Sequence, residues 1–242
     1  MKKIIFGALM LCSITTFAQK VTFGAKAGLN ISNLSGDYPT TSGDYLTIET
    51  SPLTSFHLGG FVEFHLNEKI KFAPELLISI QGNQIDTRGT VWNPPTQTYQ
   101  TQRFVQNPTL TYLNIPLMFK YEVINKLHLE VGPQIGFLIS AKSKWEYTNA
   151  DAPAENSTVT VDLLNDGIYY FGGQQIYVEK GMNGMDLSLN IGASYDLTQS
   201  LFVQARYGGG VAAIDSKSQL AGEVKSLNLK NSVFQFSLGY RF

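Results

Sequence analysis

The sequence predicts an all-β fold, an eight-stranded antiparallel transmembrane β-barrel with long loops at one end and short turns at the other. Three observations lead to this prediction. Eight segments alternate apolar and polar residues with a period of two, which is the pattern of a strand with two unlike faces. The connections between these segments alternate between long and short. Only 15% of the 242 residues are charged, well below the roughly 25% that is usual in soluble globular proteins.

The N-terminal segment has the features of a secretory signal peptide. Two lysines precede an apolar run at residues 4–14, and small residues occupy the positions expected for cleavage between Ala18 and Gln19. The run is too short to cross a bilayer as a helix, which takes about 20 residues. We therefore expect a signal peptide at 1–18 and an exported barrel domain at 19–242.

The single cysteine, Cys12, falls inside this signal segment. The exported domain therefore has no disulfide framework and no cysteine-based zinc site. Attachment of a lipid to Cys12 is an alternative, but that chemistry requires a small residue before the cysteine, and Leu11 stands there.

The predicted strands begin with a clear example, in which Phe23, Ala25, Ala27, Leu29 and Ile31 alternate with small or polar residues. Most of the eight segments contain about ten or more residues, the length that crosses a bilayer at a tilt near 45°. In chain order they occupy residues 22–31, 56–66, 70–81, 111–122, 127–140, 185–197, 201–207 and 234–242.

Prolines interrupt three of these segments, at Pro74, Pro116 and Pro133. A proline removes a backbone donor from the ladder and is commonly found at bulges. We therefore keep the three strands and expect a local bulge at each proline.

The lengths of the connections place the two ends of the barrel. The short ones are 67–69, 122–126 and 198–200, and the long ones are 32–53, 82–108, 141–183 and 212–226. All long loops then lie at one end and both termini at the other. This asymmetry is typical of outer-membrane barrels, which have long extracellular loops and short periplasmic turns.

The sequence does not by itself show which face of each strand points inward. A soluble barrel of the lipocalin type places its apolar residues inside and its charges outside. Here the polar faces consist mostly of Gly, Ser, Asn and Gln with few charges, a poor exterior for a soluble protein. This composition favours the membrane barrel, with the polar faces inward.

The C-terminal strand, 234–242, places Tyr240 and Phe242 on its apolar face and ends on an aromatic residue. It resembles the terminal β-signal that the outer-membrane assembly machinery reads. With the opening run FGAKAGLNIS at 23–32 and the run YLNIPLMFKY at 112–121, the exported chain resembles the PorT-type outer-membrane β-barrel family. The resemblance implies an outer-membrane location. The founding member is tied to protein secretion, and most members have no assigned role.

The polar faces carry charges of both signs in near balance. Eight strands enclose an interior just wide enough for side chains, and a buried charge without a partner costs several kcal/mol. We therefore expect a plugged interior held by ion pairs, with a narrow pore for small solutes as the alternative. The expected lumen network consists of Lys26, Glu63, Glu75, Lys120, Glu130 and Arg206, and the same faces also carry His57, His65, Lys71, Glu122, His128, Asp186, Asp196 and Arg241.

A lipid-acting enzyme is a weaker alternative. It would use His57 or His65 as a base beside Glu63, with a serine from a loop as nucleophile. Nothing in the sequence places that serine beside them, and a metal site built from two histidines and a carboxylate is equally weak. We therefore expect no enzymatic activity, no catalytic or metal-binding residues and no cofactor.

The long loops are the better candidates for function, because binding residues concentrate in loops on a rigid scaffold. Loops 82–108 and 141–183 are rich in aromatic residues, of which Trp145 and Tyr147 fit anchors at the lipid interface. Alternation at 168–178 predicts a hairpin within the larger loop. The expected partners are outer-membrane lipids, the assembly machinery and a protein or glycan at the extracellular loops. The net charge of −1 argues against nucleic acid.

Overall fold

The computed structural model describes residues 21–37, 46–93, 97–215, 218–220, 223–225 and 227–242. The predicted signal peptide and its cleavage residues Ala18 and Gln19 lie outside this part of the chain. Within it, no helix has the length and apolar character needed to span a membrane. The elements are β1 (Val21–Ser35), β2 (Leu46–His65), β3 (Ile70–Asn93), β4 (Thr98–Ile124), β5 (Leu127–Asn149), η2 (Pro153–Glu155), β6 (Ser157–Asp162), β7 (Gly167–Phe171), β8 (Gln174–Val178), β9 (Met185–Asp196), β10 (Leu201–Gly210), β11 (Ser218–Leu220), β12 (Glu223–Lys225) and β13 (Lys230–Arg241).

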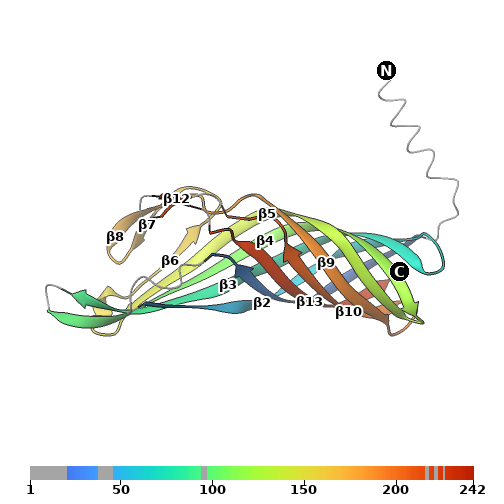
Figure 1. Cartoon of the computed structure of the whole chain (residues 1–242), viewed down its shortest axis with the longest axis horizontal. Helices are drawn as coiled ribbons and strands as arrows, with labels where there is room; N and C mark the ends of the chain where they lie inside the picture. Colours follow the sequence, from blue (N-terminus) through green and yellow to red (C-terminus); the bar gives the residue numbers. More distant parts are fainter. Residues whose placement is uncertain (1–20, 38–45, 94–96, 216–217, 221–222, 226) are drawn as a thin grey trace, which may run out of the picture.

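Eight of the strands close into a ring, as predicted. The order around the ring is β1, β2, β3, β4, β5, β9, β10 and β13, and every neighbouring pair is antiparallel. Pairing of β1 with β13 joins the first strand to the last, so the barrel has no open edge within this ring. Figure 1 shows the strands tilted across a cylinder, with the C-terminus at the short-turn end.

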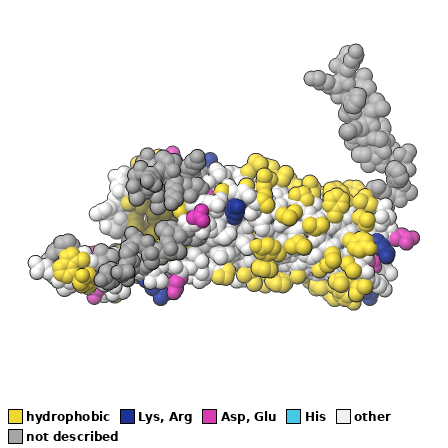
Figure 2. All heavy atoms as spheres, in the orientation of Figure 1, with side chains coloured by type: hydrophobic (Ala, Val, Ile, Leu, Met, Phe, Trp, Pro, Cys, Tyr) yellow, Lys and Arg dark blue, Asp and Glu magenta, His cyan; other side chains and the backbone are white. Residues whose placement is uncertain are grey.

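The polar faces point inward and the apolar faces outward. On β2, His57 is 1% exposed, whereas its neighbours Phe56 and Leu58 are 51% and 49% exposed. The same alternation repeats around the ring, so that an apolar band covers the outside of the barrel (Figure 2). An exterior of this kind is suited to lipid and not to water, which confirms the membrane barrel over the soluble alternative.

The three short connections are tight turns held by local side-chain hydrogen bonds. After β2, the Asn67 carboxamide oxygen accepts the backbone N–H groups of Lys69 and Ile70. After β9, the Thr198 hydroxyl accepts those of Ser200 and Leu201. Asn and Thr favour turns because their side chains replace a backbone acceptor in this way.

The bulges predicted at the prolines are wrong. Pro74 lies opposite Leu117 within an unchanged register between β3 and β4, and Pro116 and Pro133 also sit in regular ladders. An antiparallel strand directs alternate N–H groups to its two neighbours, so one proline removes one bond and leaves the pairing on either side intact. The register shifts instead between Pro52 and His57, between Thr111 and Tyr112, and between Glu122 and Ile124.

Residues 82–108, predicted as a loop, form most of a long two-stranded ribbon. β3 and β4 stay paired as far as Asn93 and Thr98, in the same register as inside the barrel. Gly82 adopts a φ of 152°, and a Cβ there would lie 2.0 Å from the carbonyl oxygen of Pro108. The prediction failed because both faces of the ribbon are mostly polar, without the aliphatic face that marks a membrane strand.

The third long connection contains the predicted hairpin. β7 and β8 pair from Gly167 opposite Val178 to Phe171 opposite Gln174. Gly172 and Gly173 make the two-residue turn, with φ values of 61° and 74°, a conformation that glycine adopts without strain. This part of the prediction is confirmed.

The wall of the barrel is much higher on one side than on the other. β2, β3, β4 and β5 continue past the ring at the long-loop end, and β6 pairs with the extended part of β5. On the opposite side, β1 ends at Ser35 and β10 at Gly210. The result is a five-stranded sheet that projects beyond the barrel, visible at the left of Figure 1. We call it the extension.

Candidate functional site

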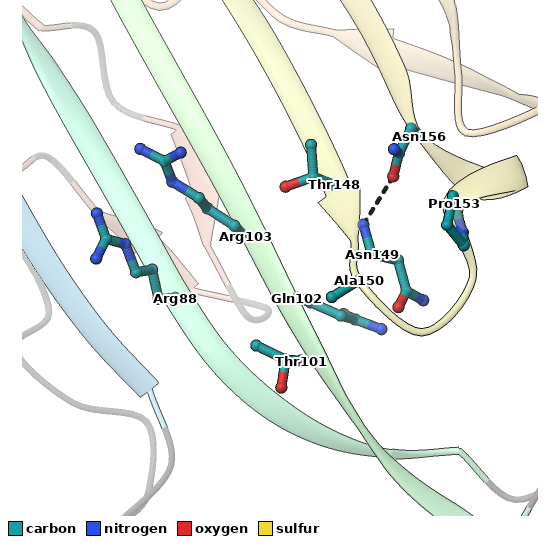
Figure 3. Close-up of a pocket in the computed structure, with 9 residues that line it drawn as sticks. All are labelled: Arg88, Thr101, Gln102, Arg103, Thr148, Asn149, Ala150, Pro153 and Asn156. Carbon is teal, nitrogen blue, oxygen red and sulfur yellow. Dashed lines mark hydrogen bonds between the residues drawn. The ribbon is translucent and has the colours of Figure 1, made fainter.

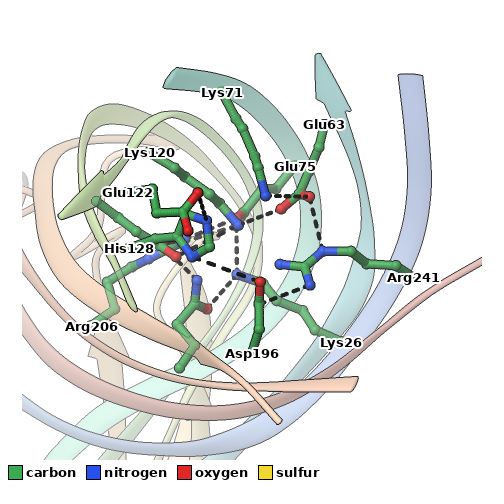
Figure 4. A network of polar contacts seen from close by, with 12 residues as sticks. Lys26, Glu63, Lys71, Glu75, Lys120, Glu122, His128, Asp196, Arg206 and Arg241 are labelled. Carbon is green, nitrogen blue, oxygen red and sulfur yellow. Dashed lines mark hydrogen bonds and ion pairs between the residues drawn. The ribbon is translucent and has the colours of Figure 1, made fainter. Parts of the chain in front are cut away.

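The six charged residues predicted for the lumen come together in one connected network at the short-turn end (Figure 4). Arg206 contacts Glu75 with two 2.8 Å bonds and Glu130 with a third of 3.0 Å. The Lys26 ammonium lies 2.7 Å from Glu75, and the Lys120 ammonium 2.8 Å from Glu63 and 3.6 Å from Glu130. Three cations face three carboxylates, so the six side chains carry no net charge.

A second set of charges continues this network toward the short turns. Arg241 joins Glu63 at 2.9 Å to Asp196 at 2.8 Å. Lys71 lies 4.0 Å from Glu63, and its side chain is 12% exposed. The network therefore runs from the fully buried centre of the barrel to its partly exposed short-turn end.

Two inward-facing phenylalanines pack among these charges. The rings of Phe61 and Phe202 meet edge to face with centroids 5.6 Å apart, and the Lys120 ammonium lies 5.5 Å and 5.3 Å from their centroids. Each ring lies over a glycine on the neighbouring strand. Phe61 is opposite Gly24 and Phe202 is opposite Gly239. These contacts fill the space beside the ion pairs. The pairing of a phenylalanine with a glycine was not predicted from the sequence.

His57 lies in an uncharged polar layer above the ion pairs. Its Nδ1 is 2.7 Å from the Asn30 carboxamide oxygen and its Nε2 is 2.8 Å from the Ser237 hydroxyl. The serine beside His57 thus comes from β13 and not from a loop, and both ring nitrogens are engaged by residues other than Glu63. All three side chains are buried.

The other two histidines are not brought to His57. His65 is half-buried at the last position of β2. His128 lies between Glu122 and Asp196, at 4.0 Å and 3.9 Å. Among the described residues, no group of His, Cys, Asp and Glu is arranged to hold a metal ion.

An apolar plug closes the long-loop end of the lumen. Met182 and Ile214 enter from the loops and pack against Tyr112 and other inward-facing residues of the ring. The Asp215 carboxylate holds the plug by accepting the backbone N–H groups of Leu227 and Leu229 at 2.7 Å and 2.8 Å. A polar lumen throughout was expected from the sequence, and this plug was not predicted. Its buried members are Leu34, Leu110, Tyr112, Leu138, Ala141, Met182, Ile214 and Leu229.

Little open space remains between the plug and the ion pairs. The cavity beside Asp186, Asn190 and Asn231 has a volume of about 10 Å³. That is about the size of a single water molecule by this measure.

Trp145 and Tyr147, predicted as anchors at the lipid interface, lie instead on the inner face of the extension. Phe171 of the β7–β8 hairpin packs against both of them and against Phe104, with ring centroids 5.8 to 6.4 Å apart. The inner face of the extension is therefore covered by the hairpin, and the interface prediction is wrong for these two residues.

The outer face of the extension carries a cluster of charges at Asp86. Arg103 and Arg88 each donate through Nε and Nη2 to its carboxylate, at distances from 2.7 to 3.3 Å. These hydrogen bonds, first from Arg103 and then from Arg88, hold the pKa of Asp86 well below its usual range. The stabilisation is therefore complete above the ordinary pKa of an aspartate and is lost only as the pH falls through the lowered value.

A groove of about 520 Å³ adjoins this cluster (Figure 3). Arg88 and Arg103 lie on one side of it, and the backbone N–H of Asn149 donates to the Asn156 carboxamide oxygen on the other. Its remaining walls are uncharged, from Thr101, Gln102, Thr148, Ala150 and Pro153. The arginines in this groove were not singled out in the sequence.

The two aromatic residues predicted as an assembly signal lie on the outside of β13 at the short-turn end. Tyr240 is 50% and Phe242 80% exposed, and their ring centroids are 5.6 Å apart.

Comparison with known proteins gives one family and several similar folds. The model of the outer membrane protein beta-barrel domain family matches residues 17–215. Escherichia coli outer membrane protein W is similar, with a TM-score of 0.40, 16% identity, and coverage of 93% of this chain and 100% of that one. Neisserial surface protein A has a TM-score of 0.39 and 9% identity, with coverage of 92% of this chain and 99% of that one. OprG of Pseudomonas aeruginosa has a TM-score of 0.37 and 11% identity, with coverage of 93% of this chain and 97% of that one. At these scores and identities, none of the likenesses bears on function. No curated protein sequence matches.

Proposed function

This chain belongs to the family of outer membrane protein beta-barrel domains, and on that premise we propose that it is a non-enzymatic barrel that presents an extracellular interaction surface. The barrel lies in the outer membrane, where lipids contact its apolar band. The extension and its hairpin then stand on the extracellular side, because long loops of such barrels lie there. The buried ion pairs in the lumen hold together the barrel strands that carry the extension.

One observation carries the proposal. The β7–β8 hairpin is apolar on both faces, although it lies beyond the lipid band. Its inner face packs on the extension through Phe171. Its other face leaves Ile168, Tyr170 and Tyr177 60%, 73% and 61% exposed, and Ile168 is directly opposite Tyr177. Large apolar side chains gathered outside a membrane are typical of a protein interaction site.

Two narrower parts of the proposal rest on resemblance. The likeness of the runs at 23–32 and 112–121 to the PorT family supports a role in protein secretion. The aromatic end of β13, Tyr240 and Phe242, supports recognition by the outer-membrane assembly machinery.

Capture from the outer membrane tests the interaction role. A barrel tagged after Gln19, extracted in mild detergent, is expected to bring down a recurrent set of proteins. The triple variant Ile168→Thr, Tyr170→Ser, Tyr177→Ser should lose that set, because it removes the exposed apolar face without touching the packed one. Lys144→Ser with Glu146→Ser, an exposed pair on the extension, is the matched control. Recovery of the barrel alone, or the same set with the triple variant, would contradict the proposal.

A narrow pore is the alternative that the structure disfavours, because an apolar plug and a network of ion pairs occupy the lumen, and the cavity beside Asp186 has a volume of only about 10 Å³. The purified barrel is therefore expected to give no conductance steps in planar bilayers. Steps in the unmodified barrel whose ion selectivity changes in Glu63→Gln or Lys120→Met would establish a pore and overturn this expectation.

A further inference from the structure

The outer face of the β3–β4 ribbon carries three cross-strand pairs in succession. Arg88 lies opposite Arg103, Thr90 opposite Thr101, and Trp92 opposite Tyr99. Because alternate residues of a strand share a face and directly opposed residues project together, the six side chains form one row. All six are exposed. We call this row the ladder.

The distal end of the ladder is an aromatic platform. The rings of Trp92 and Tyr99 have centroids 5.1 Å apart at 63°, and the residues are 47% and 62% exposed. Along β3, the preceding exposed large apolar residue is Ile78, on the lipid face. Trp92 is fourteen residue steps beyond Ile78, about 45 Å along a strand. The platform is therefore far from the lipids of its own membrane.

The proximal end of the ladder is cationic. Between Arg88 and Arg103 the sequence contains no other charged residue. Asp86 lies on the barrel side of both arginines and is saturated by them. Each guanidinium uses Nε and Nη2 for this contact, which does not involve its Nη1 donors. One carboxylate shared by two guanidiniums leaves one unit of positive charge among these three side chains and holds both cations in fixed orientations.

Three further acidic residues lie near the ladder, and two of them, Glu49 and Glu146, act through their charge on Arg88 and Arg103 respectively. Asp151 accepts the backbone N–H of Thr101 at the edge of β4. Glu49 lies opposite Asp86, below the arginines, and Glu146 is paired with Lys144. The exposed row itself therefore runs from aromatic through hydroxyl to cationic groups, beside a groove lined by threonine and amide side chains.

This order of aromatic, hydroxyl and cationic groups along the ladder fits a sugar chain with acidic substituents. Aromatic rings stack on the apolar faces of sugar rings, hydroxyl and amide groups bond to sugar hydroxyls, and arginine pairs with carboxylate or phosphate. The two ends of the ladder are four residue steps apart, about 13 Å. A protein partner fits less well, because the apolar surface of the ladder is limited to two rings, and the hairpin packs on the opposite face of the extension.

We propose that the ladder binds an extracellular glycan that carries carboxylate or phosphate groups. Trp92 and Tyr99 stack on its sugar rings, Thr90 and Thr101 bond to its hydroxyls, and the arginines hold its anionic groups. This assignment rests on the extracellular placement of the extension under the proposed function and names a ligand class for a different part of it.

Binding measurements with defined glycans test the assignment. Oligogalacturonate supplies carboxylates, phosphorylated mannan supplies phosphates, and dextran is the neutral probe. The detergent-solubilised barrel is expected to bind at least one acidic probe saturably, with a change in tryptophan fluorescence and weaker binding at high salt. Trp92→Ala with Tyr99→Ala, and separately Arg88→Gln with Arg103→Gln, should each weaken that binding at least tenfold. Lys144→Gln, on the same face outside the ladder, is the control and should bind normally.

Several results would overturn the assignment. These are no binding of either acidic probe, equal binding of dextran, or unchanged binding by the two ladder variants. The same variants separate this inference from the proposed function. If the ladder variants still capture the protein set that the hairpin variant loses, while the unmodified barrel binds no glycan, the glycan assignment fails and the interaction role stands.

Discussion

Replacing Arg206 with methionine is expected to lower the free energy of unfolding of the barrel by about 3 to 5 kcal/mol, the usual cost of breaking a buried ion pair. Arg206 is fully buried and bonds to two carboxylates, those of Glu75 and Glu130. Methionine preserves much of the volume but leaves the six-residue network with one excess negative charge. Urea unfolding in detergent micelles, followed by tryptophan fluorescence, measures the loss.

A second substitution separates the charge from the packing. Arg206→Met with Glu75→Gln restores charge balance, so the double variant should be more stable than the sum of the two single losses predicts. The exposed Arg88→Met is the matched control and should change stability far less than Arg206→Met, because exposed ion pairs contribute little. Equal losses for Arg206→Met and Arg88→Met, or strict additivity with Glu75→Gln, would show that the lumen network does not act as a unit.

Gly239→Ala is expected to destabilise the barrel by about 1 to 3 kcal/mol through overpacking. A Cβ at this position would lie 2.2 Å from Cζ of Phe202, and the three nearest atoms all belong to that ring. The ring is fully buried and also lies under Arg241, whose Cζ is 4.5 Å from the centroid, so it has little room to move. Slower folding into vesicles and a lower urea midpoint, read from heat-modifiable gel mobility, report the effect.

Removing the Phe202 ring tests whether the loss of stability is due to the steric clash. In a Phe202→Ala background, which is itself costly because it opens a cavity, the added methyl group of Gly239→Ala should be neutral or stabilising. Gly60→Ala is the control, because its nearest neighbour would be 3.5 Å away, an ordinary contact on the exposed face. A Gly239→Ala loss that persists without the Phe202 ring would point to a backbone effect and contradict the packing explanation.

The ends of the barrel strands at the short turns and the location of the lumen charges were predictable because both follow from local periodicity. Alternation fixes which side chains share a face, and the scarcity of charges indicates that the apolar face meets lipid. Lys26 and Arg206 are far apart in the sequence, yet their positions on polar faces were sufficient to place both in the lumen. Which carboxylate each one contacts depends on the stagger of the closed ring, and that was not readable from the pattern.

The sequence by itself determined that this protein is an eight-stranded membrane barrel with polar faces inward, because period-two alternation and tight turns are local properties of the chain. Only the tertiary structure decided what lies beyond the lipid band. The ribbon of β3 and β4 lacks an aliphatic face, so the pairing of its two strands is visible only in the structure. The plug brings Met182 and Ile214 together from separate loops, and the ladder pairs Arg88 with Arg103 across strands. These arrangements depend on contacts between distant segments, which no local pattern encodes.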